Sequence, residues 1–505
     1  MENINDKLSQ QTINDIVWRA CDTFRGVIDG NDYKNYILVM LFIKYISDVW
    51  QYKKEQLGRK YPGNKNRVER KLKAETFTLP AGHSFEDLYN KRQVDNIGEE
   101  IDISIHAVEE ANREKLEGVF RGINFNSDKI GEIRERNVLL RHLLEDFADP
   151  RLNLRPDNIG EDVIGEAYMY LIERFGGEAG KKAGEFYTPA TVRRLIAQLA
   201  QARKSAEIYD PACGSASLLI DTAQAIGGED FALHGQENNE ATVALAKMNV
   251  LLHSQYAADI RRGDTLRAPR FIDGNHIKRF DIVVANPPFS LDKWGAQEVE
   301  DDRYNRFWRG IPPKSKADWA FICHMLELAK PQSGRVVVVV PHGVLFRGAA
   351  EGKIRRQVIE ENLLDTVIGL PANLFSTTGI PVALLLFDKR REKGGELEKR
   401  KNVLFIDASK HYEAKRNRNE LREADIKRIL TTAQKRQTAD KYARVSTAKE
   451  IAENDYNLNI PRYVDTFQEE EPIDIKAVQK EIGQLEKELD NVRKEMSSVM
   501  KKMMR

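Results

Sequence analysis

Residues 208–218 read IYDPACGSASL, which is a short apolar strand followed by a turn of small residues and the start of a helix. Small residues let the backbone of such a turn approach a ligand closely, and the helix N-terminus favours a negatively charged group. Glu237 follows Gly214 by 23 positions, near the offset of about 20 residues at which a carboxylate holds ribose hydroxyls. The stretch therefore predicts a nucleotide-type site, and a plain strand–helix turn is the competing interpretation.

Short apolar strands alternate with helical segments on both sides of this turn. The pattern predicts strands at residues 207–210, 231–236, 259–263, 281–285, 335–341, 366–370, 382–388 and 402–407. Such alternation is typical of an α/β fold, a mostly parallel sheet covered by helices on both faces. The sequence GIP at 379–381 lies between the strands at 366–370 and 382–388, so these two strands are expected to form an antiparallel pair at an edge of the sheet.

Composition shifts divide the chain into four parts. Residues 1–160 show apolar residues at helical spacing, residues 161–410 carry the strands, residues 411–470 form a charged helical extension, and residues 471–505 form a separate helix. Within the first part, Gly30-Asn31-Asp32 interrupts the helical pattern, and Asn31 or Asp32 is a candidate cap for the next helix.

The last part carries a heptad repeat. Apolar residues alternate steps of three and four positions at Ile475, Val478, Ile482, Leu485, Leu489, Val492, Met496, Val499 and Met503. Lys and Glu between them favour a coiled coil. A long helix packed on its own domain is the alternative, but a narrow apolar seam is usually matched by a seam on another helix. We expect a partner helix.

The balance of charge limits how the chain can bind nucleic acid. The 505 residues include 79 Lys and Arg against 78 Asp and Glu, whereas a protein that wraps DNA by electrostatics alone is usually basic. A basic surface must then be local or come from a partner. Three widely separated cysteines, Cys21, Cys213 and Cys323, indicate a reducing, cytoplasmic environment and no zinc site. We also expect no signal peptide and no membrane span.

The absence of phosphate-binding motifs limits the kinds of ligand that the turn can bind. The sequence contains no G-x-x-x-x-G-K-[ST] loop, and the turn at 210–217 lacks a full G-x-G-x-x-G. A nucleoside with a small zwitterionic tail, such as S-adenosylmethionine, fits better than a pyrophosphate. Gly263-Asp264-Thr265 follows a further strand, and a carboxylate there could accept a hydrogen bond from an adenine amino group. Alone, that tripeptide is more often a plain turn.

Residues 283–290, VVANPPFS, end a predicted core strand in an unusual way. Asn286 precedes a proline, which favours an extended backbone, and two prolines in series stiffen the chain. The Asn286 side-chain oxygen and a neighbouring carbonyl can both accept hydrogen bonds from one NH2 group and direct its lone pair at an electrophile. Phe289 offers a face for stacking a planar base. The competing interpretation is a proline-terminated strand with a buried phenylalanine.

Taken together, these motifs resemble the modification (M) subunit of type I restriction–modification systems. The resemblance rests on WRACDTFRGVIDGNDYKNYILVMLFIKYISD at 18–48, GEFYTP at 184–189, DPACGSAS at 210–217, VVANPPFS at 283–290 and the heptad tail. It implies a Rossmann-like S-adenosylmethionine-dependent methyltransferase domain at 161–410, an N-terminal α-helical domain and a C-terminal helical or coiled-coil tail. The implied activity is site-specific methylation of adenine N6 in DNA.

The resemblance also implies roles for individual residues. The catalytic residues would be Asn286, Pro287, Pro288 and Phe289, which hold a flipped adenine. The cofactor-binding residues would be Glu185, Phe186, Tyr187, Thr188, Pro189, Asp210, Pro211, Ala212, Cys213, Gly214, Ser215, Ala216, Ser217, Glu237 and Asp264. The chain departs from the family at Ser215-Ala216-Ser217, where further glycines are common. No metal is implied, and no metal-ligand cluster is visible.

The implied partners are double-stranded DNA, a specificity (S) subunit that recognises the sequence, a second M subunit, and a restriction (R) subunit in the full complex. The methyl transfer would be a direct displacement, catalysed mainly by positioning and electrostatics. Two alternatives stay open: methylation of cytosine N4 or a protein amide, and a non-catalytic scaffold that keeps the fold.

Overall fold

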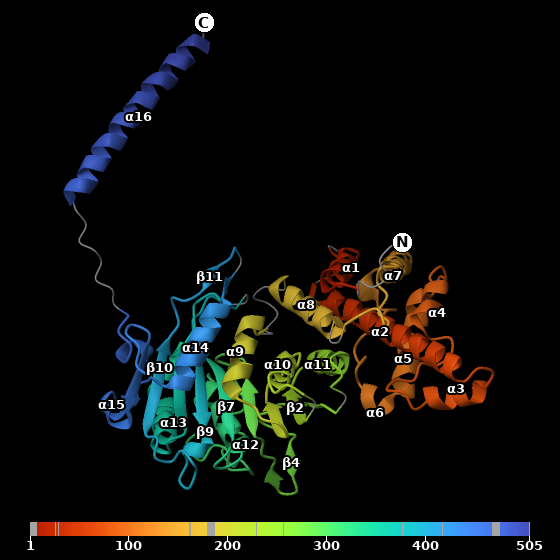
Figure 1. Ribbon diagram of the computed structural model, residues 1–505, viewed down its shortest axis with the longest axis horizontal. Coiled ribbons are helices and arrows are strands. Elements are labelled where there is room, and N and C mark those ends of the chain that lie inside the picture. Colours follow the sequence, from red (N-terminus) through yellow and green to blue (C-terminus); the bar gives the residue numbers. More distant parts are fainter. Residues whose placement is uncertain are drawn as a thin grey trace. The chain divides into compact units, whose positions relative to one another are not determined.

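The computed structural model describes residues 8–25, 27–28, 30–160, 163–178, 187–228, 230–255, 257–375, 378–416, 418–466 and 475–503 (Figure 1). It divides into two compact units, Met1–Val464 and Asp465–Arg505. The first unit contains both the helical N-terminal part and the sheet. Glu185 and Phe186 of the predicted site lie outside the described residues.

The N-terminal part of the first unit is built of helices, as predicted. They are α1 (Gln10–Asp22), α2 (Gly30–Lys60), α3 (Lys65–Leu72), α4 (Phe85–Asn90), α5 (Ile97–Ala111), α6 (Arg113–Leu116), α7 (Ile133–Phe147) and α8 (Val163–Glu178), with a 3₁₀ turn, η1 (Asp128–Ile130). The apolar run of α2, Ile37 to Ile43, is almost fully buried at the centre of this bundle. Because α2 begins at Gly30, the predicted cap at Asn31 or Asp32 is wrong.

One nine-stranded sheet organises the rest of the unit. Its order is β13-β10-β8-β9-β7-β6-β1-β2-β3. The strands are β1 (Ala206–Asp210), β2 (Phe231–Glu237), β3 (Asp259–Arg262), β6 (Ile282–Ala285), β7 (Arg335–Pro341), β8 (Leu364–Gly369), β9 (Val382–Asp388), β10 (Asn402–Asp407) and β13 (Ala443–Thr447). Two short hairpins, β4 (Ile272–Asp273) with β5 (His276–Ile277) and β11 (Glu413–Ala414) with β12 (Asn419–Glu420), stand apart.

Strand direction corrects one prediction. The pairs β3–β2, β2–β1, β1–β6, β6–β7 and β8–β10 are parallel, whereas β9 is antiparallel to both β7 and β8. The predicted antiparallel pairing of β8 with β9 is therefore confirmed, but β9 is an interior strand and not an edge. All seven residues of β9 are buried, which fits a strand with neighbours on both sides and cover on both faces.

Helices cover both faces of the sheet, and alternate strand residues divide between two cores. Val283 and Val338 face a core shared with α12 (Asp318–Leu328) and α13 (Ala349–Glu360). Val284 and Val339 face the opposite core, together with α9 (Ala190–Ala200), α10 (Ser217–Gln224), α11 (Glu240–Leu252) and α14 (Glu423–Lys435). This two-residue alternation between covered faces confirms the doubly wound α/β class.

The stretch after residue 410 is only partly helical, although the sequence pattern predicts a charged helical extension over residues 411–470. It contains α14, α15 (Ala448–Glu453) and the 3₁₀ turn η5 (Ile460–Arg462), but also β13, which pairs with β10 at the edge of the main sheet. Ala443 and Ser446 of β13 are buried, whereas Arg444 and Thr447 are exposed, so this edge strand is only partly covered. Two further 3₁₀ turns are η3 (His342–Leu345) and η4 (Lys389–Arg391).

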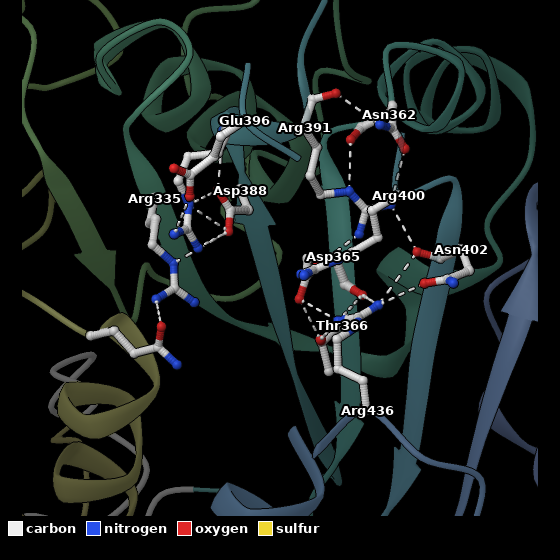
Figure 2. Close-up of polar contacts among 12 residues, drawn as sticks. Arg335, Asn362, Asp365, Thr366, Asp388, Arg391, Glu396, Arg400, Asn402 and Arg436 are labelled. Carbon is white, nitrogen blue, oxygen red and sulfur yellow. Dashed lines mark hydrogen bonds and ion pairs between the residues drawn. The ribbon is translucent and has the colours of Figure 1, made fainter. Parts of the chain in front are cut away.

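A polar cluster lies at the amino ends of the parallel strands β8 and β10. Asp365, near the start of β8, pairs with Arg391 at 2.8 Å and with Arg436 at 2.7 Å (Figure 2). Arg391 is only 1% exposed and also donates to the backbone carbonyl of Asn402. Because the cluster joins β8, β10 and α14 through buried charge, we assign it to the stability of the sheet.

The second unit contains helix α16 (Ile475–Met503), 29 residues long. Its apolar side chains from Ile482 to Met496 are 50% to 60% exposed. The predicted helix is confirmed, while its coiled-coil partner stays a prediction. In the ranges that the structure describes, no helix has the length and apolar character to cross a bilayer.

Candidate active site

A cavity of about 450 Å³ lies at the carboxyl edge of the parallel strands. Ligands bind at this edge in doubly wound sheets, and the volume is in the range of small-molecule sites. It brings together most of the predicted site residues: Tyr187, Thr188, Asp210, Pro211, Ala212, Cys213, Gly214, Ser215, Ser217, Glu237, Asp264, Asn286 and Pro288. Four predicted residues, Pro189, Ala216, Pro287 and Phe289, are not part of its lining.

The turn between β1 and α10 has the backbone that its small residues predict. Gly214 has φ +52°, and a Cβ built on it would meet no atom within 4 Å, so this residue borders open space. Ala216 has φ +62°, a left-handed conformation that costs a residue with a Cβ about 1–2 kcal/mol. This strain is the structural consequence of Ser215-Ala216-Ser217 in place of further glycines.

The two serines of the turn are held by a small polar network. The Ser215 and Ser217 hydroxyls lie 2.6 Å apart, and the Ser217 hydroxyl donates to the Met169 sulfur of α8 at 3.1 Å. Asn249 Nδ2 of α11 donates to the Ser215 carbonyl at 2.7 Å. The turn is thus fixed from α8 and α11, two helices that also pack into the N-terminal bundle.

Two carboxyl groups approach the cavity from neighbouring strand ends. Glu237 ends β2, where one of its oxygens accepts the Gly214 N–H at 3.2 Å and the other accepts the Asn239 N–H at 2.8 Å. Asp210 ends β1, is 2% exposed and accepts the Ala212 N–H at 2.9 Å. Burial raises the pKa of Asp210 to about 8, and the nearby Glu237 charge adds to the rise.

The third carboxylate sits on the loop after β3. Asp264 Oδ1 accepts the backbone N–H groups of Leu266 and Arg267 at 3.0 and 3.1 Å. The neighbouring Thr265 hydroxyl donates to the Pro211 carbonyl at 2.5 Å, which ties this loop to the β1–α10 turn. Asp264 therefore lies at the carboxyl edge of the sheet, as its position after a predicted strand indicated.

Asn286 directly follows β6 and is held from the segment before α9. Its Nδ2 donates to the Thr188 hydroxyl at 2.9 Å, and the side chain is 9% exposed. The Thr188 carbonyl accepts Arg193 Nη1 at 2.8 Å, and Arg193 Nε donates to Asp221 at 2.8 Å. Arg193 Nη1 also donates to the Tyr187 hydroxyl. Thr188 thus orients the amide, in addition to lining the cavity.

Phe289 lies beside the cavity and is half-buried. Its ring packs edge-on against Phe375 with centroids 6.1 Å apart and planes at 72°. The next residue, Ser290, has φ +51° and donates its backbone N–H to buried Asp318 at 2.9 Å. The loop after the two prolines is therefore anchored to the N-terminus of α12.

Several lining residues gave no signal in the sequence. They come from the helical part, from α9, from α12 and from the chain after the prolines: Lys34, Ile172, Phe175, Arg193, Leu291, Trp294 and Phe321. Arg193 lies on α9, an amphipathic helix that begins two residues after Thr188. Its position on the apolar side of that helix is a signal that could have identified it as a buried arginine. Lys34 lies 180 positions before Gly214 in the sequence, and no local pattern connects the two. His324 and Cys323 of α12 are fully buried and do not line the cavity.

The residues of the cavity fit S-adenosylmethionine. A carboxylate at the end of β2 suits ribose hydroxyls, the open space at Gly214 lets a ligand approach the backbone, and the loop after β3 supplies a carboxylate for an adenine amino group. Such a sheet, with this cavity at the ends of its central strands, defines the class of Rossmann-like S-adenosylmethionine-dependent methyltransferases.

Comparisons with known proteins give the family. A model of the N-6 DNA methylases matches residues 159–472, and a model of the HsdM N-terminal domain matches residues 13–147. The chain therefore belongs to the N-6 DNA methylase family, as a methylase (M) subunit of the type I restriction enzymes, and its cofactor is S-adenosylmethionine. The resemblance predicted from the motifs is confirmed.

The relatives match along most of their length. The type I restriction enzyme MpnII methylase subunit of Mycoplasma pneumoniae is 29% identical, over 93% of this chain and 92% of its own. The MjaVIII methylase subunit of Methanocaldococcus jannaschii is 30% identical, over 95% and 82%. A solved type I restriction-modification methyltransferase subunit from Streptococcus thermophilus is 33% identical, covers 91% and 100%, and superimposes with a TM-score of 0.82.

Proposed function

We propose that this subunit methylates the N6 amino group of a flipped adenine in double-stranded DNA, and that Asn286 is its main catalytic residue. The observation that supports this proposal is the placement of Asn286. It follows β6 in the same cavity as Glu237 and Asp210, with Pro288 beside it and its amide held by Thr188. Bound S-adenosylmethionine supplies an electrophilic methyl group on a positively charged sulfur.

In this proposal, the side-chain oxygen of Asn286 and the backbone carbonyl of Pro287 accept the two N6 hydrogens of the adenine. These hydrogen bonds draw the hydrogens away from the ring plane, so that the nitrogen lone pair points at the methyl carbon. The bound cofactor would supply its methyl group to this nitrogen, while Asn286 and the Pro287 carbonyl would hold the amino group in place. Phe289 supports the base by stacking, which is worth about 1–3 kcal/mol in single-stranded complexes.

The test compares the parent with Asn286→Ala in the assembled complex with DNA. Tritiated methyl transfer is measured, and the DNA is digested to nucleosides to identify the product. We expect N6-methyladenine from the parent and no transfer by the variant, with S-adenosylmethionine affinity nearly unchanged. The control Asn457→Ala alters a loop asparagine that does not line the cavity. Normal transfer by Asn286→Ala, or label in N4-methylcytosine or in protein, would contradict the proposal.

We further propose that α16 binds a specificity subunit by forming a coiled coil. The support is its exposed apolar stripe, because a single such stripe leaves apolar surface in water unless another helix covers it. In this arrangement, residues 1–160 help enclose the DNA, residues 161–410 carry out transfer, residues 411–470 extend that domain and residues 471–505 bind the partner. Two M subunits would share one S subunit, with an R subunit added for restriction. A cytoplasmic location follows from a DNA substrate.

Deletion of residues 470–505 should weaken complex formation with the specificity subunit on gel filtration. The double substitution Leu485→Glu and Leu489→Glu should do the same, because it places charge in the apolar stripe. The matched control is Lys487→Glu with Lys494→Glu, on the opposite side of the same helix. If the stripe variant assembles as well as the control, the coiled-coil proposal is wrong.

A further inference from the structure

The helical N-terminal part contributes a positive charge to the cofactor cavity. Lys34, in the second turn of α2, lines the cavity together with Ile172 and Phe175 of α8. All three belong to elements outside the sheet. Lys34 itself is half-buried.

Packing between α2 and α8 fixes where this lysine lies. Tyr33, its neighbour in sequence, packs edge-on against Phe175 with ring centroids 5.5 Å apart and planes at 80°. Nearly two turns earlier on α8, Met169 accepts the Ser217 hydroxyl at 3.1 Å. Helix α8 thus forms one wall that runs about 9 Å, at 1.5 Å per residue, from the β1–α10 turn to the neighbourhood of Lys34.

The other charged residues that line the cavity make it unfavourable for a carboxylate ligand unless a cation pairs with that ligand. Three carboxyl groups line it, those of Asp210, Glu237 and Asp264. The second cation of the lining, Arg193, is 4% exposed and is committed to Asp221, the Thr188 carbonyl and the Tyr187 hydroxyl. A ligand that brings its own carboxylate into this acidic cavity needs a charged donor, and a lysine ammonium has three N–H donors to share among acceptors.

We propose that Lys34 binds the carboxylate of the methionine part of S-adenosylmethionine, so that the helical domain completes the cofactor site. Glu237 and Asp264 would hold the ribose and adenine, and the turn at Ser215–Ser217 leads the methionine part toward the α8 wall. The inference rests on the cofactor assignment of the family and not on the role proposed for Asn286. In this proposal, Lys34 couples the two parts of the molecule: cofactor binding favours packing of the helical domain against the sheet, and that packing favours cofactor binding.

Calorimetric titration of the full-length chain tests this assignment without any methyl transfer. The ligands are S-adenosylmethionine and its decarboxylated analogue, which keeps the nucleoside, the sulfonium and the amino group. The parent should bind the complete cofactor roughly 10- to 100-fold more tightly, the range expected for hydrogen bonds between charged groups. Lys34→Met should lose most of this preference, with little change for the analogue, whereas Lys34→Arg should keep it.

The control Lys54→Met removes a lysine from the same helix, more than five turns beyond Lys34, and should leave both affinities unchanged. Equal weakening of both ligands by Lys34→Met would show a purely structural role and overturn the proposal. Equal binding of both ligands by the parent would overturn it as well, and that measurement does not depend on the folding of any variant. Failure of the Asn286 proposal would instead appear as normal transfer by Asn286→Ala, so the two outcomes are distinct.

Discussion

Thr188→Val removes the hydroxyl oxygen that accepts a hydrogen bond from Asn286, the proposed catalytic residue. In the parent, Asn286 Nδ2 donates to the Thr188 hydroxyl at 2.9 Å, and both side chains are at most 9% exposed. Valine has nearly the shape of threonine, and the backbone carbonyl of residue 188 keeps its hydrogen bond from Arg193. The substitution therefore removes the acceptor while the surrounding backbone contacts are retained.

The expected loss of activity follows from the burial of the Asn286 amide. A buried donor that loses its acceptor costs about 1–3 kcal/mol, and the amide can recover part of this by rotating away from the orientation in which its oxygen meets the substrate. If that cost falls on the transition state, kcat/KM for DNA drops roughly 5- to 150-fold. Cofactor affinity should change much less, because the Thr188 hydroxyl is directed at Asn286.

The assay is single-turnover tritium transfer by the assembled complex, with S-adenosylmethionine affinity measured by calorimetry on the same preparations. Thr188→Ser keeps the hydroxyl and should retain most of the parental rate. Transfer at the parental rate by Thr188→Val would refute the orienting role. Equal losses for valine and serine would also refute it, because serine keeps the hydroxyl and the loss would then not follow from the missing acceptor.

Three further predictions concern charge and backbone conformation. Asp210→Asn should be more stable than the parent, and the difference in unfolding free energy should grow by about 1.4 kcal/mol per pH unit between pH 5 and 7. The reason is that the pKa of Asp210 is raised, so its ionisation destabilises the folded state progressively above the pKa of the unfolded chain. A difference in urea unfolding that stays constant with pH would disprove this. Asp365→Asn should lose roughly 3–5 kcal/mol in urea unfolding at pH 7, because it leaves buried Arg391 and half-buried Arg436 without their carboxylate partner. The lowered pKa of Asp365 makes its contribution full above the unfolded value near 4, so the difference should shrink as pH falls below that; a constant difference would contradict the ion-pair explanation. Gly214→Val should abolish detectable cofactor binding in calorimetry, since φ is +52° and the side chain would enter the cavity; parental affinity would show that this space is not used.

The alternation of strands and helices made the fold class predictable. It did not predict which strands lie next to each other in the sheet. The residues of β9, VALLLFD, form a continuous apolar run, which is the pattern of a strand buried on both faces. That run could have identified an interior strand, and the nearby Gly-Ile-Pro turn directed attention to the edge instead. β13 was missed because its five residues lie in a charged region whose sequence resembles a helix.

The predicted site was largely accessible from the sequence because of where its residues stand. Asp210, Glu237, Asp264 and Asn286 each end a parallel strand or follow one closely, and the topology brings such ends to one edge of the sheet. Lys34 could not be predicted in the same way. Its position depends on how a separate helical part packs against α8 and α11, which is decided by side chains far apart in sequence.

Arg193 connects the two halves of the site that the sequence presented as separate motifs. It pairs with Asp221 on α10, the helix that begins at the cofactor turn, and it holds the Thr188 carbonyl next to the hydroxyl that orients Asn286. A displacement of α10 would therefore reach the Asn286 amide through consecutive short, buried contacts. Methyl transfer depends on the alignment of the reacting atoms, and a misplacement of about 1 Å can cost on the order of 100-fold in rate. A single buried arginine that positions both the turn and the asparagine supplies that alignment from one side chain.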